Sequence, residues 1–255
     1  MRALYSAPRG VNRSGFEYHA GLRLEREELE EIVRGWGAQV VRLPFNQEWA
    51  LRRDGYLEAI DEAICRLDEL GAIAIPTLQW LRAETRISPL PDEESVELWR
   101  LLASRYRRRE NVWFDLYTEP HDVAAAEWSR WAQRLVDAVR AENRETPLLI
   151  SGVDWGYDLR GVEATGEGII YSTHVYPNKT LDWYTAFGQF AGVKPLFAGE
   201  WGGEEKDLAW GQALADYLRR IGAGWTAWSW SDWPHLQRDG QATPFGEMVR
   251  EELRR

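Results

Sequence analysis

Residues 27–44, EELEEIVRGWGAQVVRLP, contain the repeating unit that decides the fold. Leu29, Ile32 and Trp36 recur at helical spacing and would share one face of a helix, which the next glycine can end. The mostly apolar run 40–44 follows and is typical of a buried strand that ends at its proline. The unit therefore predicts a helix followed by a short buried strand, as in a parallel sheet covered by helices.

The same alternation of helix-period segments and short apolar runs continues along the chain. The predicted strands lie near residues 9–11 and at residues 40–44, 72–75, 112–116, 148–150, 169–171, 196–198 and 225–230. Strands that alternate with helices pair in parallel through right-handed crossovers. Eight such units predict an α/β fold, a single (β/α)₈ TIM barrel over residues 1–255 with no accessory domain. A doubly wound open sheet is the alternative, but the count of eight and the lack of a glycine-rich phosphate loop weigh against it.

The composition excludes some classes of function. Lys and Arg number 31 against 41 Asp and Glu, a net charge of −10, which argues against a nucleic-acid partner. The basic run 105–109 falls at the end of a predicted helix, where cations complement the helix dipole. No segment is long and apolar enough to span a membrane, and the first residues lack the apolar core of a signal peptide. The compartment stays open: cytoplasmic for the chain as it stands, or secreted if a signal was removed.

Two residue counts bear on the chemistry. The chain has 15 tryptophans, and the flat face of an indole suits the apolar face of a pyranose ring. It has a single cysteine, Cys65, so an internal disulfide is excluded. We expect no metal or other cofactor, because no second His or Cys stands at ligand spacing from His174.

Titratable residues stand where the predicted strands end. They follow the second strand (Arg42), the fourth (Glu119), the sixth (His174 and Tyr176) and the seventh (Glu200). The active site of a (β/α)₈ barrel lies at this end of the strands, so we expect these side chains to converge. Two carboxylates at one rim fit glycoside hydrolysis, in which one protonates the leaving oxygen and the other attacks the anomeric carbon. We expect the carboxyl groups to be about 5–5.5 Å apart, the separation that predicts retention of configuration.

The other three residues have natural roles beside these carboxylates. Arg42 and the Tyr176 hydroxyl would keep Glu200 ionised through charge and hydrogen bonding, and His174 would hold Glu119 in place. Plainer explanations stay open. Each glutamate could be half of a structural ion pair, and His174 and Tyr176 could be satisfied polar residues of the core.

Six short motifs follow one another in register with the predicted strands. They are residues 10–17 (GVNRSGFE), 41–44 (VRLP), 117–120 (YTEP), 174–176 (HVY), 199–202 (GEWG) and 228–232 (WSWSD). In this order they resemble the successive motifs of glycoside hydrolase family 5, the cellulase and mannanase family of clan A. The resemblance implies that Glu119 is the acid/base and Glu200 the nucleophile. It also implies that Trp228 is the stacking platform under the sugar at the cleavage point.

Two positions depart from the family pattern. Thr118 stands where the family has an Asn whose amide holds the sugar 2-hydroxyl. Gln79 ends the third strand where the family has the His of an Asp-x-His motif. The lost amide contact is one that should strengthen in the transition state, so we expect weakened catalysis on glucan or a substrate handled differently at C2.

Further residues after the strands are candidates for binding sugar. They are Trp80, Trp201, Trp233, Asn12 and His19, together with Thr118 and Gln79. Asp122 is instead predicted to be the N-cap of the following helix. Trp99 and Trp128 fit helix-core positions and read as packing residues.

These observations predict a retaining endo-β-1,4-glucanase that acts on a β-linked oligosaccharide or polysaccharide through a covalent glycosyl-enzyme. A β-mannanase or another β-glycosidase of the same family is the nearest alternative. A carbohydrate-binding homologue with weakened catalysis is a second, favoured by Thr118 and Gln79. An isomerase or aldolase ranks lower, because no phosphate loop or strand-end lysine follows strands seven and eight. We expect a monomer.

Overall fold

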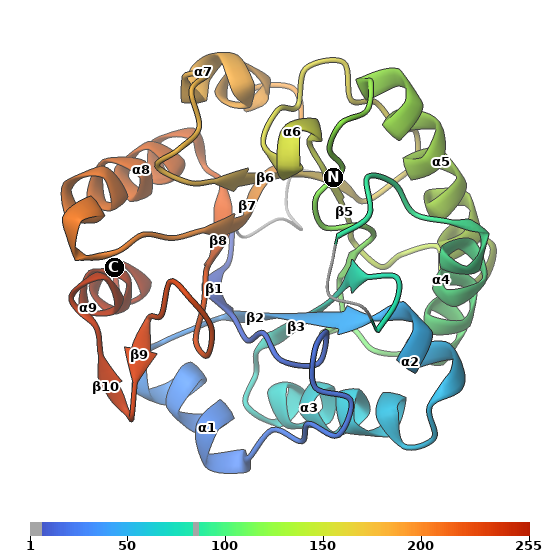
Figure 1. The fold of residues 1–255 in the computed structure, drawn as a ribbon, viewed down its shortest axis with the longest axis horizontal. Helices are drawn as coiled ribbons and strands as arrows, with labels where there is room; N and C mark the ends of the chain where they lie inside the picture. The colour runs from blue at the N-terminus through green and yellow to red at the C-terminus, as the bar shows by residue number, and fades with distance from the viewer. Residues whose placement is uncertain (1–6, 84–86) are drawn as a thin grey trace.

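The alternating helices and strands close into a barrel. The computed structural model describes residues 7–83 and 87–255; residues 1–6, part of the stretch considered above for a signal, lie outside them. Within the described ranges, eight parallel strands pair in chain order and β8 pairs with β1. They are β1 (Arg9–Asn12), β2 (Val40–Asn46), β3 (Ile73–Trp80), β4 (Phe114–Asp115), β5 (Leu148–Ser151), β6 (Ile169–Val175), β7 (Leu196–Trp201) and β8 (Gly224–Ala227). The helices surround these strands (Figure 1), so the predicted (β/α)₈ barrel is confirmed.

Some helices begin or end at residues suited to those positions. They are α1 (Arg26–Glu30), α2 (Gln47–Arg52), α3 (Tyr56–Glu69), α4 (Glu93–Arg105), α5 (Ala125–Glu142), α6 (Val153–Gly156), α7 (Trp183–Ala186), α8 (Leu208–Ile221) and α9 (Pro244–Leu253). Asp92 and Ser95 form a capping box at the start of α4. Gly222 ends α8 with a left-handed φ of 71°. Helix α1 continues as a π-helical turn, Glu31–Gly35, and two 3₁₀ turns, Gly188–Phe190 and Glu205–Asp207, complete the set.

Most strand boundaries differ from the prediction by a few residues. Strands β3, β6 and β7 run on past their predicted ends, and β4 is shorter than predicted. Strand β2 was expected to end at Pro44 but runs on to Asn46. Successive residues of a parallel strand direct their backbone N–H and C=O groups toward opposite neighbouring strands. The missing N–H of Pro44 therefore interrupts the hydrogen bonds on one side of β2 only. Pro44 still pairs with Thr77 of β3. Strand β8 ends at Ala227, so Trp228 and Trp230 lie in the loop after it and not within it.

The interior of the barrel has an apolar layer and a polar layer. Six buried side chains, from five strands and the residue before β4, make the apolar one: Val40, Ile75, Trp113, Leu149, Ile170 and Phe197. Two residues further along β2, β4 and β6, on the same inward face, the side chains are Arg42, Asp115 and Ser172, all fully buried. A second, larger apolar cluster fills the space between the strands and the outer helices. The polar layer therefore stands on an apolar floor.

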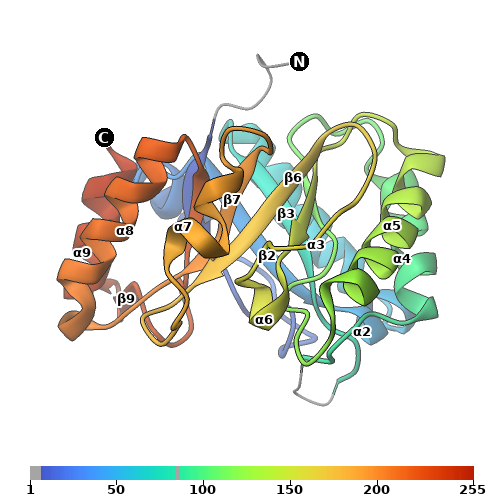
Figure 2. The same cartoon turned by 90° about the horizontal axis from the view of Figure 1, so that it is seen from above.

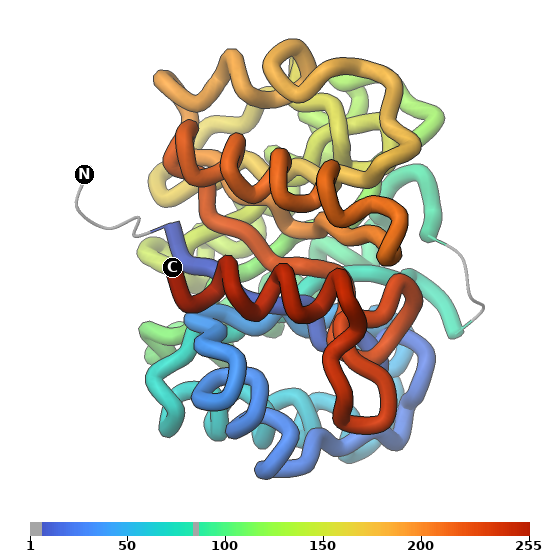
Figure 3. Tube along the Cα trace, turned by 90° about the vertical axis from the view of Figure 1, so that its left-hand side faces the viewer, coloured from blue at the N-terminus to red at the C-terminus, as the bar shows by residue number. Residues whose placement is uncertain are grey.

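The last helix completes the outer ring. Helix α9 lies beside α8 in Figure 3, and Figure 1 places it between α8 and α1. Glu252 of α9 is buried and accepts hydrogen bonds from Gln212 at 2.6 Å and Arg219 at 3.1 Å, both on α8. Helices α2 and α6 follow the carboxyl ends of β2 and β5, and both lie at the same end of the barrel (Figure 2).

No helix in residues 7–83 and 87–255 has the length and apolar character to cross a membrane.

Candidate active site

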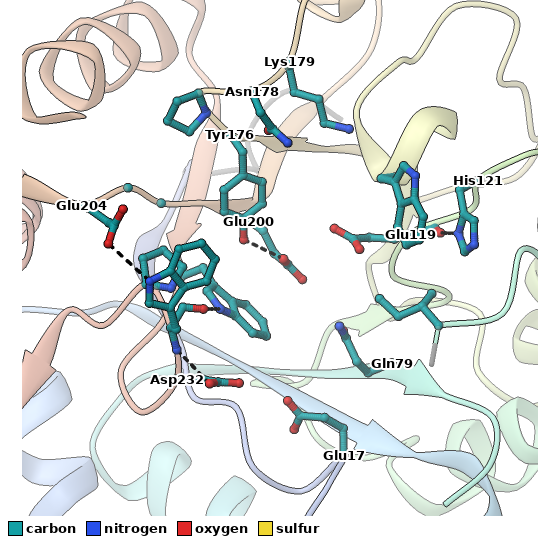
Figure 4. A pocket seen from close by; sticks show the side chains of 18 of the residues that line it. Glu17, Gln79, Glu119, His121, Tyr176, Asn178, Lys179, Glu200, Glu204 and Asp232 are labelled. Atoms are coloured by element: carbon teal, nitrogen blue, oxygen red, sulfur yellow. Dashed lines mark hydrogen bonds between the residues drawn. The ribbon is translucent and has the colours of Figure 1, made fainter. Parts of the chain in front are cut away.

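The carboxyl ends of the strands surround a cleft of about 1270 Å³. Its lining comes from the ends of β3 and β7, from α6 and from the loops that follow the other strands. Both predicted carboxylates line it. Figure 4 shows Glu119 and Glu200 reaching toward each other from opposite walls.

Glu200 is held by two donors at the end of β7. Its Oε1 accepts from Arg42 Nη1 at 2.6 Å, and its Oε2 accepts from the Tyr176 hydroxyl at 3.0 Å. The preceding Gly199 is required, because a Cβ there would lie 2.5 Å from the hydroxyl oxygen of Ser172. The pairing of β7 with β6 also slips by one residue at this point. The close approach and the slip together turn Glu200 into the cleft.

The Arg42 guanidinium organises the polar layer beneath the carboxylates. Besides Glu200, it donates to Asp115 at 2.8 Å, to Asn12 at 2.8 Å and to Thr118 at 3.0 Å. A planar guanidinium fixes the directions of all these bonds, so the four partners are held in one geometry. Burial raises the pKa of Asp115 to about 6, and the positive charge of Arg42 opposes that rise.

Glu119 follows β4 and contacts a buried imidazole. Its Oε1 lies 3.0 Å from His174 Nδ1. Burial raises the pKa of Glu119 to about 7, although the charges of Arg42 and Lys179 oppose the rise. Burial lowers the pKa of His174 to about 3, so its ring is neutral at ordinary pH. A carboxyl with a pKa near neutrality can both give and take a proton.

The two carboxylates are close together. One oxygen of Glu119, one oxygen of Glu200 and a ring nitrogen of His174 lie within 4.8 Å of one another. This spacing fits the shorter of the two glycosidase geometries, about 5–5.5 Å rather than 6.5–9.5 Å. The same atoms are near enough to hold a metal ion, which the sequence analysis did not expect. A metal there would have to compete with the Arg42 cation, which lies 2.6 Å from Glu200.

Two residues predicted to bind sugar lie below the cleft instead. Asn12 is fully buried, its amide nitrogen donates to Gly199 O at 3.0 Å and Thr226 O at 3.1 Å, and its oxygen accepts from Arg42. The Thr118 hydroxyl is also fully buried and lies between Arg42 and Glu200. The prediction of direct sugar contact is wrong for both, because their polar atoms are already bonded within the polar layer.

The prediction of sugar binding is also wrong for Trp201, whereas for His19 it stays a prediction. Trp201 is fully buried and packs edge-on against Trp225 and Phe245. Side chains alternate along a strand, so Trp201 faces the outer helices when Glu200 faces the cleft. His19 is exposed and lies outside the cleft lining, where its ring nitrogen accepts from Gly21 N at 3.3 Å.

The remaining candidates do line the cleft. Trp228 is largely buried and donates its indole N–H to Trp233 O at 3.0 Å. Trp233 is 61% exposed and forms part of the rim. Gln79 and Trp80 come from the end of β3. An aromatic platform is therefore available beside the carboxylates.

Three further residues line the cleft without having been predicted from the sequence, and Asp122 differs from its prediction. Glu17, Asp232 and Lys179 line the cleft. The first two lay inside quoted motifs without a role, and Lys179 follows the fourth motif, HVY. Asp122 is wrong as an N-cap, because α5 begins at Ala125 after Ala124 and Asp122 adopts a left-handed φ of 54°. It lines the cleft instead.

A family model described as Cellulase, glycosyl hydrolase family 5, matches residues 5–233. The major extracellular endoglucanase of Xanthomonas campestris pv. campestris is 26% identical, over 91% of this chain and 65% of that protein. Endoglucanase E-5 of Thermobifida fusca is 20% identical, over 88% of this chain and 52% of that protein. The chain thus spans between about half and two thirds of the length of these curated relatives.

Solved structures share the fold. A β-glucanase from Saccharophagus degradans in complex with cellotetraose has a TM-score of 0.82 at 24% identity, over 97% of this chain and 87% of that one. The catalytic domain of the Xanthomonas campestris endoglucanase has a TM-score of 0.83 at 23% identity, over 97% and 94%. The family model covers most of the sequence, and the chain therefore belongs to glycosyl hydrolase family 5, the cellulase family of glycoside hydrolases.

Proposed function

We propose that the protein is a retaining endo-β-1,4-glucanase in which Glu200 is the nucleophile and Glu119 the acid/base. The observation that carries the proposal is the carboxylate pair with oxygens within 4.8 Å, one held by a guanidinium and the other with a raised pKa. Two acids with different environments can fill different roles at one pH. The endoglucanase names of the relatives support a β-glucan substrate.

The first step forms a covalent intermediate. A Glu200 oxygen attacks the anomeric carbon while the bond to the leaving sugar breaks, and the Glu119 proton passes to the leaving oxygen. In the second step Glu119, now a carboxylate, takes a proton from water as the water oxygen attacks the same carbon. The ester to Glu200 then breaks, and both side chains return to their starting states. Two inversions give net retention.

The neighbouring residues position these two groups. Arg42 and Tyr176 donate to separate oxygens of Glu200, which leaves the carboxylate few orientations. Burial raises the pKa of Tyr176 well above its usual value, so its hydroxyl remains a donor. The neutral imidazole of His174 adds no positive charge beside Glu119, so Glu119 can keep its proton until the leaving oxygen takes it. Trp228 supplies an apolar face for the sugar ring.

Thr118 sets the expected level of activity. Its hydroxyl contacts Arg42 at 3.0 Å and Glu200 at 3.4 Å, and an amide at this place would reach further toward a sugar hydroxyl. We therefore expect measurable but reduced hydrolysis of β-1,4-glucan. β-Mannan should be assayed in parallel, because its sugars differ from those of glucan at C2. Binding of either oligosaccharide without any hydrolysis would favour the carbohydrate-binding alternative.

Trapping the intermediate tests the mechanism and the nucleophile together. The protein is incubated with an activated 2-deoxy-2-fluoro cellobioside, digested, and the modified peptide is mapped by mass spectrometry. A label on Glu200 is expected, and Glu200→Gln should remain unlabelled. A label on any other carboxylate would overturn the role assignment. A direct displacement by water, with inverted product and no label, would overturn the retaining mechanism.

A further inference from the structure

The Arg42 guanidinium lies between two carboxylates, and the proposed mechanism uses only one of them. Its Nη1 donates to Glu200 Oε1 at 2.6 Å, and its Nε donates to Asp115 Oδ2 at 2.8 Å. The side chains of Arg42 and Asp115 are fully buried, and that of Glu200 is nearly so. Buried charge is costly unless it is paired, so a second carboxylate on one guanidinium requires an explanation.

The two carboxylates share one positive charge. Among the described residues, Arg42 is the cation that pairs with both. His174 Nδ1 lies 3.7 Å from Glu200, but burial lowers the pKa of this imidazole to about 3, so it adds no charge. The Oδ1 atom of Asp115 has no hydrogen-bond partner in the described part of the chain. Two negative charges and one positive charge give this cluster a net charge of −1.

Asp115 is placed where it reaches Arg42 but not the substrate. Strand β3 pairs with both β2 and β4, Arg42 opposite Ile75 and Asp115 opposite Thr77. Asp115 is not part of the cleft lining that the described residues form, whereas Glu200 is. Any effect of Asp115 on a bound sugar must therefore pass through Arg42.

The first step of the proposed reaction removes one of the two negative charges. Attack on the anomeric carbon turns the Glu200 carboxylate into a neutral ester. Arg42 stays charged, because a guanidinium does not lose its proton in a protein. With Asp115 present, the buried cation still has a carboxylate at 2.8 Å in the glycosyl-enzyme. Without Asp115, the cation would be unpaired beneath a sugar whose anomeric carbon becomes positive in the transition state.

We propose that Asp115 is a positioning residue that acts through Arg42, as its permanent counterion while the charge of Glu200 is lost and regained. This inference rests on the proposed function, because only a covalent intermediate on Glu200 removes that charge. In the free enzyme Asp115 takes part of the attraction of Arg42, so Glu200 keeps more of its nucleophilic charge. In the intermediate Asp115 neutralises the buried cation and so stabilises the glycosyl-enzyme.

Loss of this counterion should affect the two steps in opposite directions. In the first step, Arg42 would be left to Glu200 alone, would hold the carboxylate more strongly than the transition state, and would slow its attack. In the second step, Glu200 leaves the sugar as a carboxylate, and an unpaired Arg42 would favour the return of that charge. The second step should therefore become faster. A residue that only kept the site in shape would slow both steps when it is removed.

The test measures the two steps separately in Asp115→Asn. Asparagine removes the charge but keeps the size of the side chain and an acceptor for Arg42 Nε. Native chain and variant are incubated at pH 7 with a dinitrophenyl 2-deoxy-2-fluoro cellobioside, whose phenolate leaves as Glu200 bonds to the anomeric carbon. Intact mass follows the gain of label and, once the reagent is removed, its loss by hydrolysis. The variant should gain label at least about tenfold more slowly and lose it at least about threefold faster.

Thr118→Val is the matched control. It also removes a partner of Arg42, the hydroxyl that accepts from Nη2 at 3.0 Å, but it changes no charge. Valine has nearly the shape of threonine, so the variant shows what a loosened Arg42 does by itself. Its loss of label should be no faster than that of the native chain.

A measurement on the native chain replaces the variant if Asp115→Asn does not fold. Burial raises the pKa of Asp115 to about 6, the charge of Arg42 opposes the rise, and the negative charge of Glu200 adds to it. Labelling Glu200 removes that negative charge, so the pKa of Asp115 should fall. Carbon NMR of protein labelled at the aspartate carboxyl carbons, before and after the fluoro sugar is attached, measures the change.

The outcomes distinguish this inference from the proposed function. Loss of label that is unchanged or slower in Asp115→Asn would overturn the inference, although a label on Glu200 would still support the retaining mechanism. A pKa of Asp115 that stays the same or rises on labelling would have the same meaning. No label on Glu200 of the native chain would overturn the proposed function and this inference together.

Discussion

The two layers inside the barrel differ in what they contribute, although the same strands supply both. Phe197 of β7 belongs to the apolar floor, and Glu200, three residues later on the same strand, belongs to the cleft. The floor removes apolar surface from water and makes few directional contacts. The polar layer gathers Arg42, Asp115 and Glu200, three groups whose burial disfavours folding unless each is paired. Residues that stabilise the barrel and residues that form the active site therefore stand only two or three positions apart on the same strand.

Removing the nucleophile should have the largest effect. The change should affect activity and leave stability nearly unchanged. We expect Glu200→Ala to lower kcat by at least about 10⁴-fold, since the covalent step then has no acceptor. Its melting temperature should change little, because Arg42 keeps Asp115 as a partner at 2.8 Å. Kinetics and thermal unfolding of the same preparation measure both. A large fall in melting temperature would mean that the polar layer also holds the fold together.

The acid/base should be distinguishable from the nucleophile by its pH dependence. With a Glu119 pKa of about 7, native kcat/KM should fall as pH rises above 7, because the acid loses its proton. Glu119→Gln should lose about 10²–10⁴-fold on cello-oligosaccharides and should no longer show this alkaline decline. Aryl glycosides with good leaving groups need little protonation, so their first step should be nearly unaffected. An equal loss on both substrate types would contradict the assignment.

A substitution in the floor should give the opposite result. Phe197 is fully buried and meets Trp113 at a ring distance of 6.4 Å. Phe197→Ala should cost about 3–5 kcal/mol of unfolding free energy, the usual range for a buried aromatic side chain. The folded fraction should retain kcat within about threefold. Urea unfolding and activity per folded molecule measure the two quantities, and a kcat loss of 100-fold would show that the layers are coupled.

The fold could be predicted because its signal is local. Short apolar runs and helix periodicity mark the eight units, and six motifs place the carboxylates at strand ends. The ends of individual strands were harder, since Pro44 lies inside β2 and pairs with Thr77. A separate misplaced strand end, that of β7, led to the prediction for Trp201. Had β7 been taken through residue 201 and not to 198, alternation would have turned Trp201 away from the cleft.

The rest of the site depends on contacts between distant segments. Asp115 meets Arg42 across 73 residues because β3 lies between their strands and pairs with both: Arg42 pairs with Ile75, and Asp115 with Thr77, two residues further along β3. No local pattern in the sequence encodes this pairing. Asn12 looked like a sugar ligand from its place after β1, but Arg42 and two backbone carbonyls already satisfy its amide. Glu17 lay in a quoted motif, yet its burial depends on how the loop folds over the barrel. Hydrogen-bond satisfaction is a tertiary property, so these roles were open until the structure was known.

The smallest expected effect is the change of folding stability with pH that the buried carboxyl groups cause. The pKa of Glu17 is raised from 4.5 to about 8, so the folded state binds its proton more tightly than the unfolded state does. The stabilisation is complete below pH 4.5 and is lost as pH rises through about 8. Glu119 and Asp115, with pKa values of about 7 and about 6, act in the same direction. The native protein should therefore become less stable between pH 5.5 and 7.5.

Glu17→Gln should make that decline shallower, because glutamine does not titrate. A single group changes the unfolding free energy by at most about 1.4 kcal/mol per pH unit, so the two slopes should differ by no more than this amount. Urea unfolding at pH 5.5, 6.5 and 7.5 measures the slopes, with Glu163→Gln as the exposed control that should follow the native protein. Parallel slopes for Glu17→Gln and the native chain would mean that Glu17 titrates normally and is hydrated. In that case the buried polar layer above the apolar floor would consist of Arg42 and its partners, and would not include the wall of the cleft.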